Sequence, residues 1–108
     1  MVMNKLLWIA GCAMLIASGA ALAANPAAGK EKSKVCAACH GPDGNSATPD
    51  FPRLAGQHYD YLVKALSDYK AGDRKNAIMA PQAANLSQRD IEDLAAYYSR
   101  QSGLVVKY

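Results

Sequence analysis

Hydrophobic and polar positions along the chain predict three helices. The clearest apolar stripe belongs to a segment from about Gln57 to Ala71, where the pattern repeats at i, i+3, i+7 and i+10. Gly72 follows it and suits the end of a helix, because glycine readily adopts the left-handed conformation. The residues on this stripe are Tyr59, Leu62, Leu66 and Tyr69.

The third predicted helix has the strongest start signal in the chain. Ser87 is suited to cap it, Asp90 lies three residues later in a carboxylate version of the capping box, and Leu86 and Ile91 are spaced for a hydrophobic staple. Gly103 marks its end. The residues expected on its buried stripe are Ile91, Leu94, Ala95 and Tyr98.

The first helix is predicted from about Pro26, which suits a first helical turn, to Cys39. Residues 41–56 hold three prolines and three glycines and read as loop, as does the stretch from Gly72 to Asn85. No period-2 strand pattern or internal repeat occurs in residues 24–108. The pattern indicates an all-α domain with loops long enough to wrap a large ligand.

The N-terminal segment has the layout of a secretory signal peptide. Lys5 precedes an almost wholly apolar run from Leu6 to Ile16, and Ala21-Leu22-Ala23 fits a cleavage motif. The apolar run is shorter than the roughly 20 residues that span a bilayer. We therefore expect residues 1–23 to be cleaved, leaving one domain over residues 24–108 in the periplasm without stable membrane insertion.

Cys12 leaves an alternative for this segment. Ile9-Ala10-Gly11-Cys12 resembles the sequence before a lipid-modified cysteine in bacterial lipoproteins. The residues that follow continue the apolar run instead of forming a polar tether. We favour Cys12 as an unmodified residue of the signal peptide.

Without residues 1–23 the chain has 85 residues and a formal charge of +2, which favours neither nucleic acid nor an acidic tail. It keeps one methionine, Met79, and only two cysteines. A domain of this size with an alanine-rich core often needs a staple, a metal or a large bound group.

The cysteines stand in the sequence Cys36-Ala37-Ala38-Cys39-His40. A zinc site usually needs a second cluster of ligands, and the chain has none. A redox dithiol usually follows a strand at a helix N-terminus. A structural disulfide suits the periplasm but leaves His40 unexplained. Covalent attachment of haem c explains all three residues, because two thiols bond the vinyl groups and the next histidine reaches the iron.

The sixth iron ligand has four candidates: Met79, His58, a lysine, or none. Met79 lies in the expected loop, flanked by small residues and Pro81, where a methionine has no obvious role in helix packing. His58 is expected at the surface. We favour Met79, so that the cofactor-binding set is Cys36, Cys39, His40 and Met79 and the metal ligands are His40 and Met79.

Taken together, these motifs resemble a class I c-type cytochrome, of the short bacterial kind that also occurs in tandem in dihaem periplasmic cytochromes. The matching stretches are CAACHGPDG, FPRLAGQ with YLVKAL, IMAP, and LSQRDIEDLAAYYS, and they span most of Asn25 to Ser102. The resemblance implies the small cytochrome c fold around one haem, with His40 and Met79 axial. It also implies that the carbonyl of Pro52 accepts a hydrogen bond from His40, and that the first helix crosses the third where Gly29 meets Tyr97.

Histidine and methionine on both sides of an iron leave no open position, so we expect a one-electron carrier and not an enzyme. The alternatives are an electron-transfer subunit of a larger periplasmic oxidoreductase, or a haem sensor or peroxidatic protein if Met79 is not a ligand. We expect a monomer that meets its redox donor and acceptor transiently. Cations that could steer such partners, although they could equally form a solvated face, are Lys30, Lys32, Lys34, Lys70, Arg74 and Lys75.

Overall fold

The structure is a computed structural model that describes residue 11 and residues 23–104. The expected signal segment therefore lies outside the described residues, except for Gly11 and Ala23, and so does Cys12. Its cleavage and any modification of Cys12 stay predictions. No helix among the described residues is long and apolar enough to cross a membrane.

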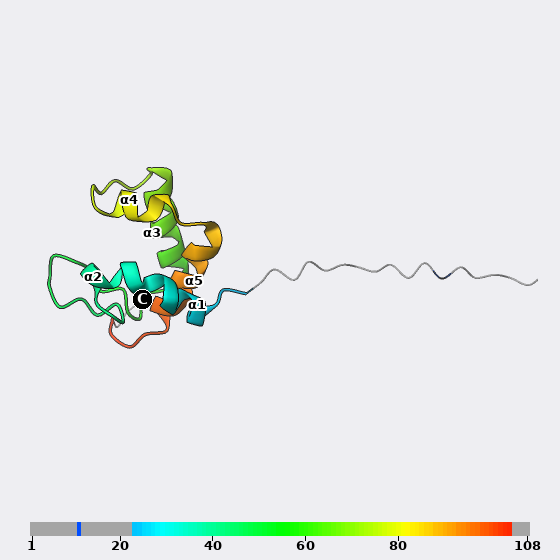
Figure 1. Ribbon diagram of the computed structural model, residues 1–108, viewed down its shortest axis with the longest axis horizontal. Coiled ribbons are helices and arrows are strands. Elements are labelled where there is room, and N and C mark those ends of the chain that lie inside the picture. Colours follow the sequence, from blue (N-terminus) through cyan, green and yellow to red (C-terminus); the bar gives the residue numbers. More distant parts are fainter. Residues whose placement is uncertain (1–10, 12–22, 105–108) are drawn as a thin grey trace, which may run out of the picture.

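The described residues form short helices joined by loops and contain no strand, which confirms the all-α prediction. In Figure 1, α3 and α4 lie on one side of the domain, α1 and α2 lie on the other, and α5 runs between them. The elements in chain order are α1 (Pro26–Lys32), a 3-10 turn η1 (Ser33–Val35), α2 (Ala37–His40), α3 (Tyr59–Ala71), α4 (Met79–Ala84) and α5 (Gln88–Ser99).

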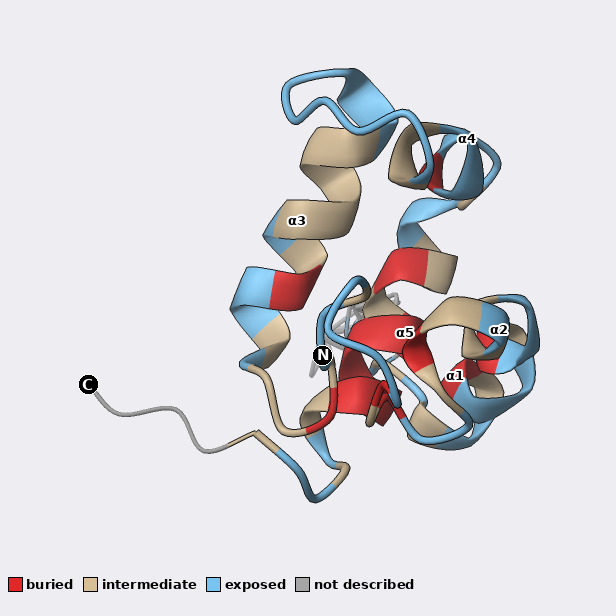
Figure 2. Ribbon diagram, turned by 90° about the vertical axis from the view of Figure 1, so that its left-hand side faces the viewer, coloured by how far each residue is buried: buried red, intermediate tan, exposed pale blue. Residues whose placement is uncertain are grey.

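Helix α5 is the centre of the core, and the buried residues concentrate on it in Figure 2. Its start is as predicted: the Ser87 side chain accepts the Asp90 N–H and the Asp90 carboxylate accepts the Ser87 N–H, which completes a capping box. All four residues of its predicted stripe are buried, namely Ile91, Leu94, Ala95 and Tyr98.

Helix α3 packs its predicted stripe against α5. Leu62 is buried, and Tyr59 and Leu66 pack partly buried against the same core cluster. The helix ends at Gly72, whose φ of 83° is left-handed and whose N–H bonds the carbonyl of Asp68, as the sequence predicts.

The crossing of α1 over α5 depends on the absence of a side chain at Gly29. A Cβ there would overlap the carbonyl oxygen of Asp93 and lie 2.8 Å from the Cβ of Tyr97. Only glycine lets the two backbones approach this closely. The contact between Gly29 and Tyr97 that the resemblance implied is therefore present.

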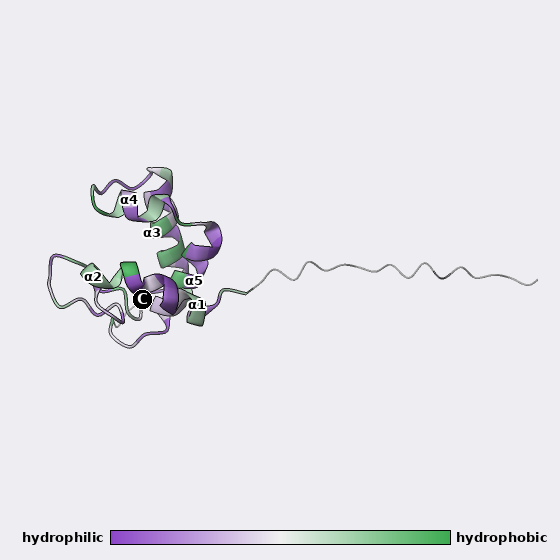
Figure 3. Cartoon of the chain, viewed as in Figure 1, coloured by the Kyte–Doolittle hydropathy of each residue, from purple (hydrophilic) through white to green (hydrophobic). Residues whose placement is uncertain are grey.

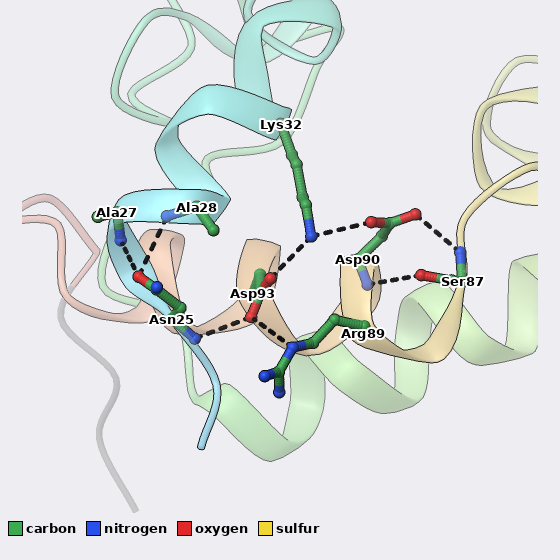
Figure 4. A network of polar contacts seen from close by, with 8 residues as sticks. All are labelled: Asn25, Ala27, Ala28, Lys32, Ser87, Arg89, Asp90 and Asp93. Carbon is green, nitrogen blue, oxygen red and sulfur yellow. Dashed lines mark hydrogen bonds and ion pairs between the residues drawn. The ribbon is translucent and has the colours of Figure 1, made fainter. Parts of the chain in front are cut away.

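A polar network ties α1 to α5, and sequence reasoning did not find it (Figure 4). Asp93 is 2% exposed; its carboxylate accepts the N–H of Asn25 at 2.8 Å and lies 2.7 Å from Nζ of Lys32. The same Nζ lies 2.9 Å from the carboxylate of Asp90, while Nε of Arg89 is 3.8 Å from Asp93. These partners compensate the buried carboxylate, which alone would be costly.

The predicted first helix is not continuous to Cys39, which corrects the sequence interpretation. It stops as an α-helix at Lys32, where the Ser33 hydroxyl donates to the carbonyl of Lys30 at 2.7 Å. The chain then tightens into η1, with the N–H of Cys36 bonded to the carbonyl of Ser33, before α2 begins. A serine that bonds a nearby carbonyl competes with the helical ladder in this way.

The packing of α3 against α5 follows from the apolar stripe that each helix presents to the other. Figure 3 shows the turn that leads into α5 as hydrophilic, and hydrophobic segments where α3 and α5 face each other. The interior between these helices is consequently apolar.

Candidate cofactor site

Cys36 and Cys39 lie at the short α2 segment, where they are half-buried and both thiols are free. Burial raises the pKa of the Cys36 thiol. The Cys36 thiol therefore stays protonated at neutral pH. Both cysteines line the same apolar space.

His40 is the last residue of α2 and is only 6% exposed. Its Nδ1 lies 2.9 Å from the carbonyl oxygen of Pro52, the contact that the resemblance implied. A carbonyl can only accept, so Nδ1 carries the proton and Nε2 keeps its lone pair free for a metal. The ring of Phe51 meets His40 edge-on, with 6.4 Å between the ring centroids, and helps to fix the imidazole.

Met79 begins a helix, α4, where the sequence predicted a loop. The reason is Asn76, whose side-chain oxygen accepts the N–H groups of Ile78 at 2.9 Å and Met79 at 3.0 Å. Pro81 is tolerated because it lies in the first turn, where the N–H groups have no partner within the helix. Ala83, fully buried, anchors the helix to the domain.

A cavity of about 430 Å³ brings the predicted site together, because Cys36, Cys39, His40 and Met79 all line it. Its walls come from segments far apart in the sequence: the residues around Pro52, the inner face of α3, and α5. Most of the lining is apolar, with aliphatic contributions from Leu54, Leu62, Ala65, Leu66, Leu94 and Ala95.

The other candidates for a sixth ligand do not reach this cavity. His58 is exposed at the start of α3 and is absent from the lining, as is every lysine among the described residues. Met79 lines the cavity, so of the side chains considered as a sixth ligand it is the one that the described residues bring to the cavity.

The alternative interpretations of the cysteine motif fit the structure less well. Within residues 23–104 no three His, Cys, Asp or Glu side chains are grouped to hold a metal ion. A redox dithiol needs a thiol with a lowered pKa, whereas the pKa of Cys36 is raised. Neither a zinc site nor a reactive dithiol is therefore supported by the geometry.

The residues present fit a haem group. The donor set consists of two thiols, one buried imidazole nitrogen with a free lone pair, and one thioether sulfur, all facing a single apolar cavity. Thioether and imidazole are an established axial pair for haem iron. The apolar walls would keep water from the metal.

Two further features of the site were not predicted from the sequence. Tyr98 was expected on the buried stripe, but its hydroxyl is buried with no hydrogen-bond partner among the described residues, and the residue lines the cavity. Arg74 was expected only as a surface cation, yet it too lines the cavity, beside Tyr61 and Tyr69. The sequence held no signal for Arg74, because its placement depends on where α3 ends relative to the cavity.

Comparison with known proteins places this geometry in a family. Residues 18–100 match the family model described as Cytochrome c. Cytochrome c4 of Azotobacter vinelandii is 45% identical over 112 residues, which cover 95% of this chain and 53% of that protein. Cytochrome c-554(548) of Halomonas halodenitrificans is 46% identical over 82 residues, covering 73% of this chain and 99% of that protein.

A solved structure agrees. The crystal structure of reduced recombinant cytochrome c4 from Pseudomonas stutzeri superposes with a TM-score of 0.72 and 48% sequence identity, covering 77% of this chain and 48% of that one. The chain spans about half the length of the cytochrome c4 relatives it matches. With the fold, the motif order and the sequence match in agreement, this chain belongs to the cytochrome c family.

Proposed function

We propose that this protein is a periplasmic one-electron carrier that holds a single haem c covalently through Cys36 and Cys39, with His40 and Met79 as the axial ligands. The observation that carries the proposal is the convergence of these four residues on one apolar cavity. When bound, haem c supplies a one-electron couple between ferric and ferrous iron.

The residues around the cavity hold the two iron ligands in position. The carbonyl of Pro52 holds the Nδ1 proton of His40, which would leave Nε2 to bind the iron. Asn76 fixes the first turn of α4 and with it the position of Met79. Ligands held on rigid elements need little rearrangement between oxidation states, which favours rapid electron transfer.

With His40 and Met79 both holding the iron, a bound haem would offer no open position to a substrate. Membership of a family of electron-transfer cytochromes is consistent with a protein that is not an enzyme. We infer a carrier that meets a donor and an acceptor in turn, as a monomer, through a small and short-lived interface.

The location is inferred from the N-terminal segment. The charge, apolar run and small residues up to Ala23 are typical of a cleaved signal peptide, which leaves residues 24–108 as the cytochrome c domain. Attachment of haem to a CxxCH motif and export through the inner membrane are compatible steps for such a chain.

The proposal is tested by expressing the full chain in a bacterium that attaches haem c, and fractionating the cells. We expect a periplasmic product that stains for haem on a denaturing gel. Its mass should equal residues 24–108 plus one haem, and it should titrate reversibly with one electron. The variant Cys36→Ala/Cys39→Ala should give no haem-stained band.

Three outcomes would overturn the proposal in different parts. A product without covalent haem would refute the cofactor assignment. Rapid binding of carbon monoxide or cyanide would indicate an open iron position and favour a sensor or a peroxidatic protein. Stoichiometric co-purification with a larger oxidoreductase would favour the subunit alternative over the free carrier.

A further inference from the structure

The chain that follows α5 returns to the loop between α2 and α3. Residues 102–104, called here the C-terminal strap, form hydrogen bonds with this loop near its beginning and near its end. The side-chain amide of Asn45 donates to the carbonyl of Ser102 at 2.9 Å. The N–H of Leu104 donates to the carbonyl of Ala55 at 2.8 Å. In Figure 1 the chain turns back after α5 toward the loop that follows α2.

The strap lies close to the loop because position 103 is a glycine. A Cβ at Gly103 would lie 2.2 Å from Oδ1 of Asn45 and 2.9 Å from the Cβ of Ala55. Ala55 is fully buried, so it cannot yield to an added methyl group without a shift of the surrounding core. A side chain at Gly103 would therefore push the strap away from the loop.

The loop that the strap contacts is also closed upon itself. The carbonyl of Gly44 accepts the N–H of Leu54 at 2.8 Å and the N–H of Ala55 at 3.2 Å. The N–H of Gly56 donates to the carbonyl of Tyr98 at 2.9 Å, which ties the end of the loop to α5. The strap and this closure therefore act on neighbouring residues of the same loop.

Pro52 lies just ahead of the part of the loop that is held in this way. Its carbonyl lies 2.9 Å from Nδ1 of His40, and only Arg53 separates it from Leu54, whose N–H is bonded. The ring of Pro52 is exposed, so its packing does little to fix the carbonyl. The position of this carbonyl consequently depends on the backbone of the loop, which the strap helps to hold.

We propose that the C-terminal strap is a positioning element for His40: it holds the carbonyl of Pro52 against Nδ1 of that ring and so lowers the reduction potential of the protein. The proposal rests on the proposed function, because it treats His40 as an iron ligand. Asn45 is the positioning residue of the strap contact. It acts at a distance, since it is not part of the described cavity lining.

The effect on the potential follows from the basicity of the imidazole. A hydrogen bond from Nδ1–H to an acceptor makes the other ring nitrogen a more basic ligand, which favours the more highly charged ferric iron. A carbonyl of Pro52 that is held less firmly gives a weaker bond to His40. Loosening the strap should therefore raise the potential. It should also let the Nδ1 proton exchange faster with water, because the loop opens more often.

Two variants loosen the strap by different means, and both leave the charge of the protein unchanged. Asn45→Ala removes the donor to the carbonyl of Ser102. Gly103→Ala adds a methyl group where the strap meets Asn45 and Ala55. If one of them fails to fold, the other still tests the proposal.

Two further variants are the controls. Ser102→Ala changes an exposed side chain in the strap but keeps the backbone carbonyl that Asn45 binds. Ile91→Val lowers the stability of the domain at a buried position of α5 that is not part of the described cavity lining. For each holoprotein we would measure the midpoint potential at pH 7, the thermal unfolding, and, in the ferrous state, the exchange of the Nδ1 proton of His40 by nuclear magnetic resonance.

We expect Asn45→Ala and Gly103→Ala each to favour the ferrous form about threefold, which corresponds to about 28 mV for one electron. The Nδ1 proton of His40 should exchange about fivefold faster in both, as for the loss of one hydrogen bond that holds the loop. Ser102→Ala should match the wild type in both measurements. Ile91→Val should unfold at a lower temperature but keep the wild-type potential.

Three results would overturn the proposal. The first is that Asn45→Ala and Gly103→Ala have the potential of Ser102→Ala. The second is an equal shift of the potential in Ile91→Val, which would assign the effect to lost stability alone. The third is a shifted potential with an unchanged exchange of the Nδ1 proton, which would mean that the strap does not act through His40.

None of these results touches the proposed function, provided that the variants still carry covalent haem and cycle by one electron. A wild-type protein without covalent haem, in contrast, would refute the proposed function itself.

Discussion

Tyr97 and Tyr98 are consecutive buried residues of α5, with ring centroids 5.1 Å apart, but their hydroxyl groups have different surroundings. The hydroxyl of Tyr97 donates to the carbonyl of Pro42 at 3.1 Å and so ties the loop after His40 to α5. The hydroxyl of Tyr98 has no hydrogen-bond partner among the described residues, and burial raises the pKa of this phenol.

This difference predicts that replacing each tyrosine by phenylalanine changes the free energy of unfolding differently. Tyr97→Phe should lower the free energy of unfolding by about 1 kcal/mol, because it leaves the Pro42 carbonyl without its donor. Tyr98→Phe should leave it unchanged or raise it slightly, since a desolvated hydroxyl is removed at no loss of a bond. Chemical denaturation of the two holoproteins under identical conditions measures both values. Equal losses in the two variants would mean that Tyr98 has a partner in the assembled protein.

A second prediction concerns the crossing at Gly29. Gly29→Ala should destabilise the domain by about 1–3 kcal/mol or more, because the new methyl group meets the Asp93 carbonyl and α1 must move away from α5. Ala27→Ser, an exposed change on the same helix, is the control and should have little effect. Thermal unfolding followed by far-UV circular dichroism compares them. If Gly29→Ala proves as stable as the control, the close crossing is not a requirement of the fold.

The network around Lys32 predicts how stability depends on pH. Bonds from the Ser87 backbone and the Lys32 side chain lower the pKa of Asp90 from 3.8 to about 2. Burial acts to raise the pKa of Asp93, but Lys32, the Asn25 N–H and Arg89 together outweigh it and lower that pKa as well. A carboxyl whose folded pKa is lowered contributes stability above its unfolded pKa and loses it as the pH falls through the folded value. We expect stability to decline between about pH 4 and pH 2.

Lys32→Met tests this dependence. It should lower stability at pH 7 by about 1–2 kcal/mol and flatten the decline below pH 4, because the two carboxylates lose a shared partner. The control is Lys34→Met, which removes an exposed pair with Glu31 and should change little. Denaturation midpoints measured from pH 2 to pH 7 give both curves. If the stability of Lys32→Met declines between pH 4 and pH 2 as that of the wild type does, the network is not the cause of this decline.

A fourth prediction separates the position of Met79 from the stability of the whole domain. Asn76→Ala removes the acceptor for the N–H groups of Ile78 and Met79, a loss comparable to that of a helix cap, about 1 kcal/mol. On heating, the band of iron–thioether bonding should disappear at a lower temperature than in the wild type, ahead of the loss of helical signal. Lys75→Ala, at the neighbouring exposed position, should behave as the wild type does. If the iron–thioether band and the helical signal of Asn76→Ala are lost at the same temperature, Asn76 has no local role at Met79.

The sequence predicted those parts of the fold that follow from local chemistry. The stripes of α3 and α5, the capping box at Ser87 and the end of α3 at Gly72 each depend on residues a few positions apart. The resemblance to a known family added two long-range contacts, between His40 and Pro52 and between Gly29 and Tyr97, that periodicity alone could not supply.

What the sequence did not predict depends on competing or distant groups. The break at Ser33 coincides with a side-chain hydrogen bond from Ser33 to the carbonyl of Lys30, which competes with the helical pattern. The start of α4 results from Asn76, in a segment too short to show a period. Arg74 was expected only as a surface cation, and nothing in the sequence marks Asp93 as buried. Only the fold brings the cavity to Arg74 and the N–H of Asn25 to Asp93. Such residues have no signature before the chain is folded.

The ligation of iron by Met79 is the central claim, and the ferric absorption spectrum tests it most directly. The wild-type holoprotein and His58→Ala should both show the weak long-wavelength band of iron–thioether bonding, and Met79→Ala should lack it while keeping its covalent haem. A band that persists in Met79→Ala, or that is absent from the wild type, would contradict the account.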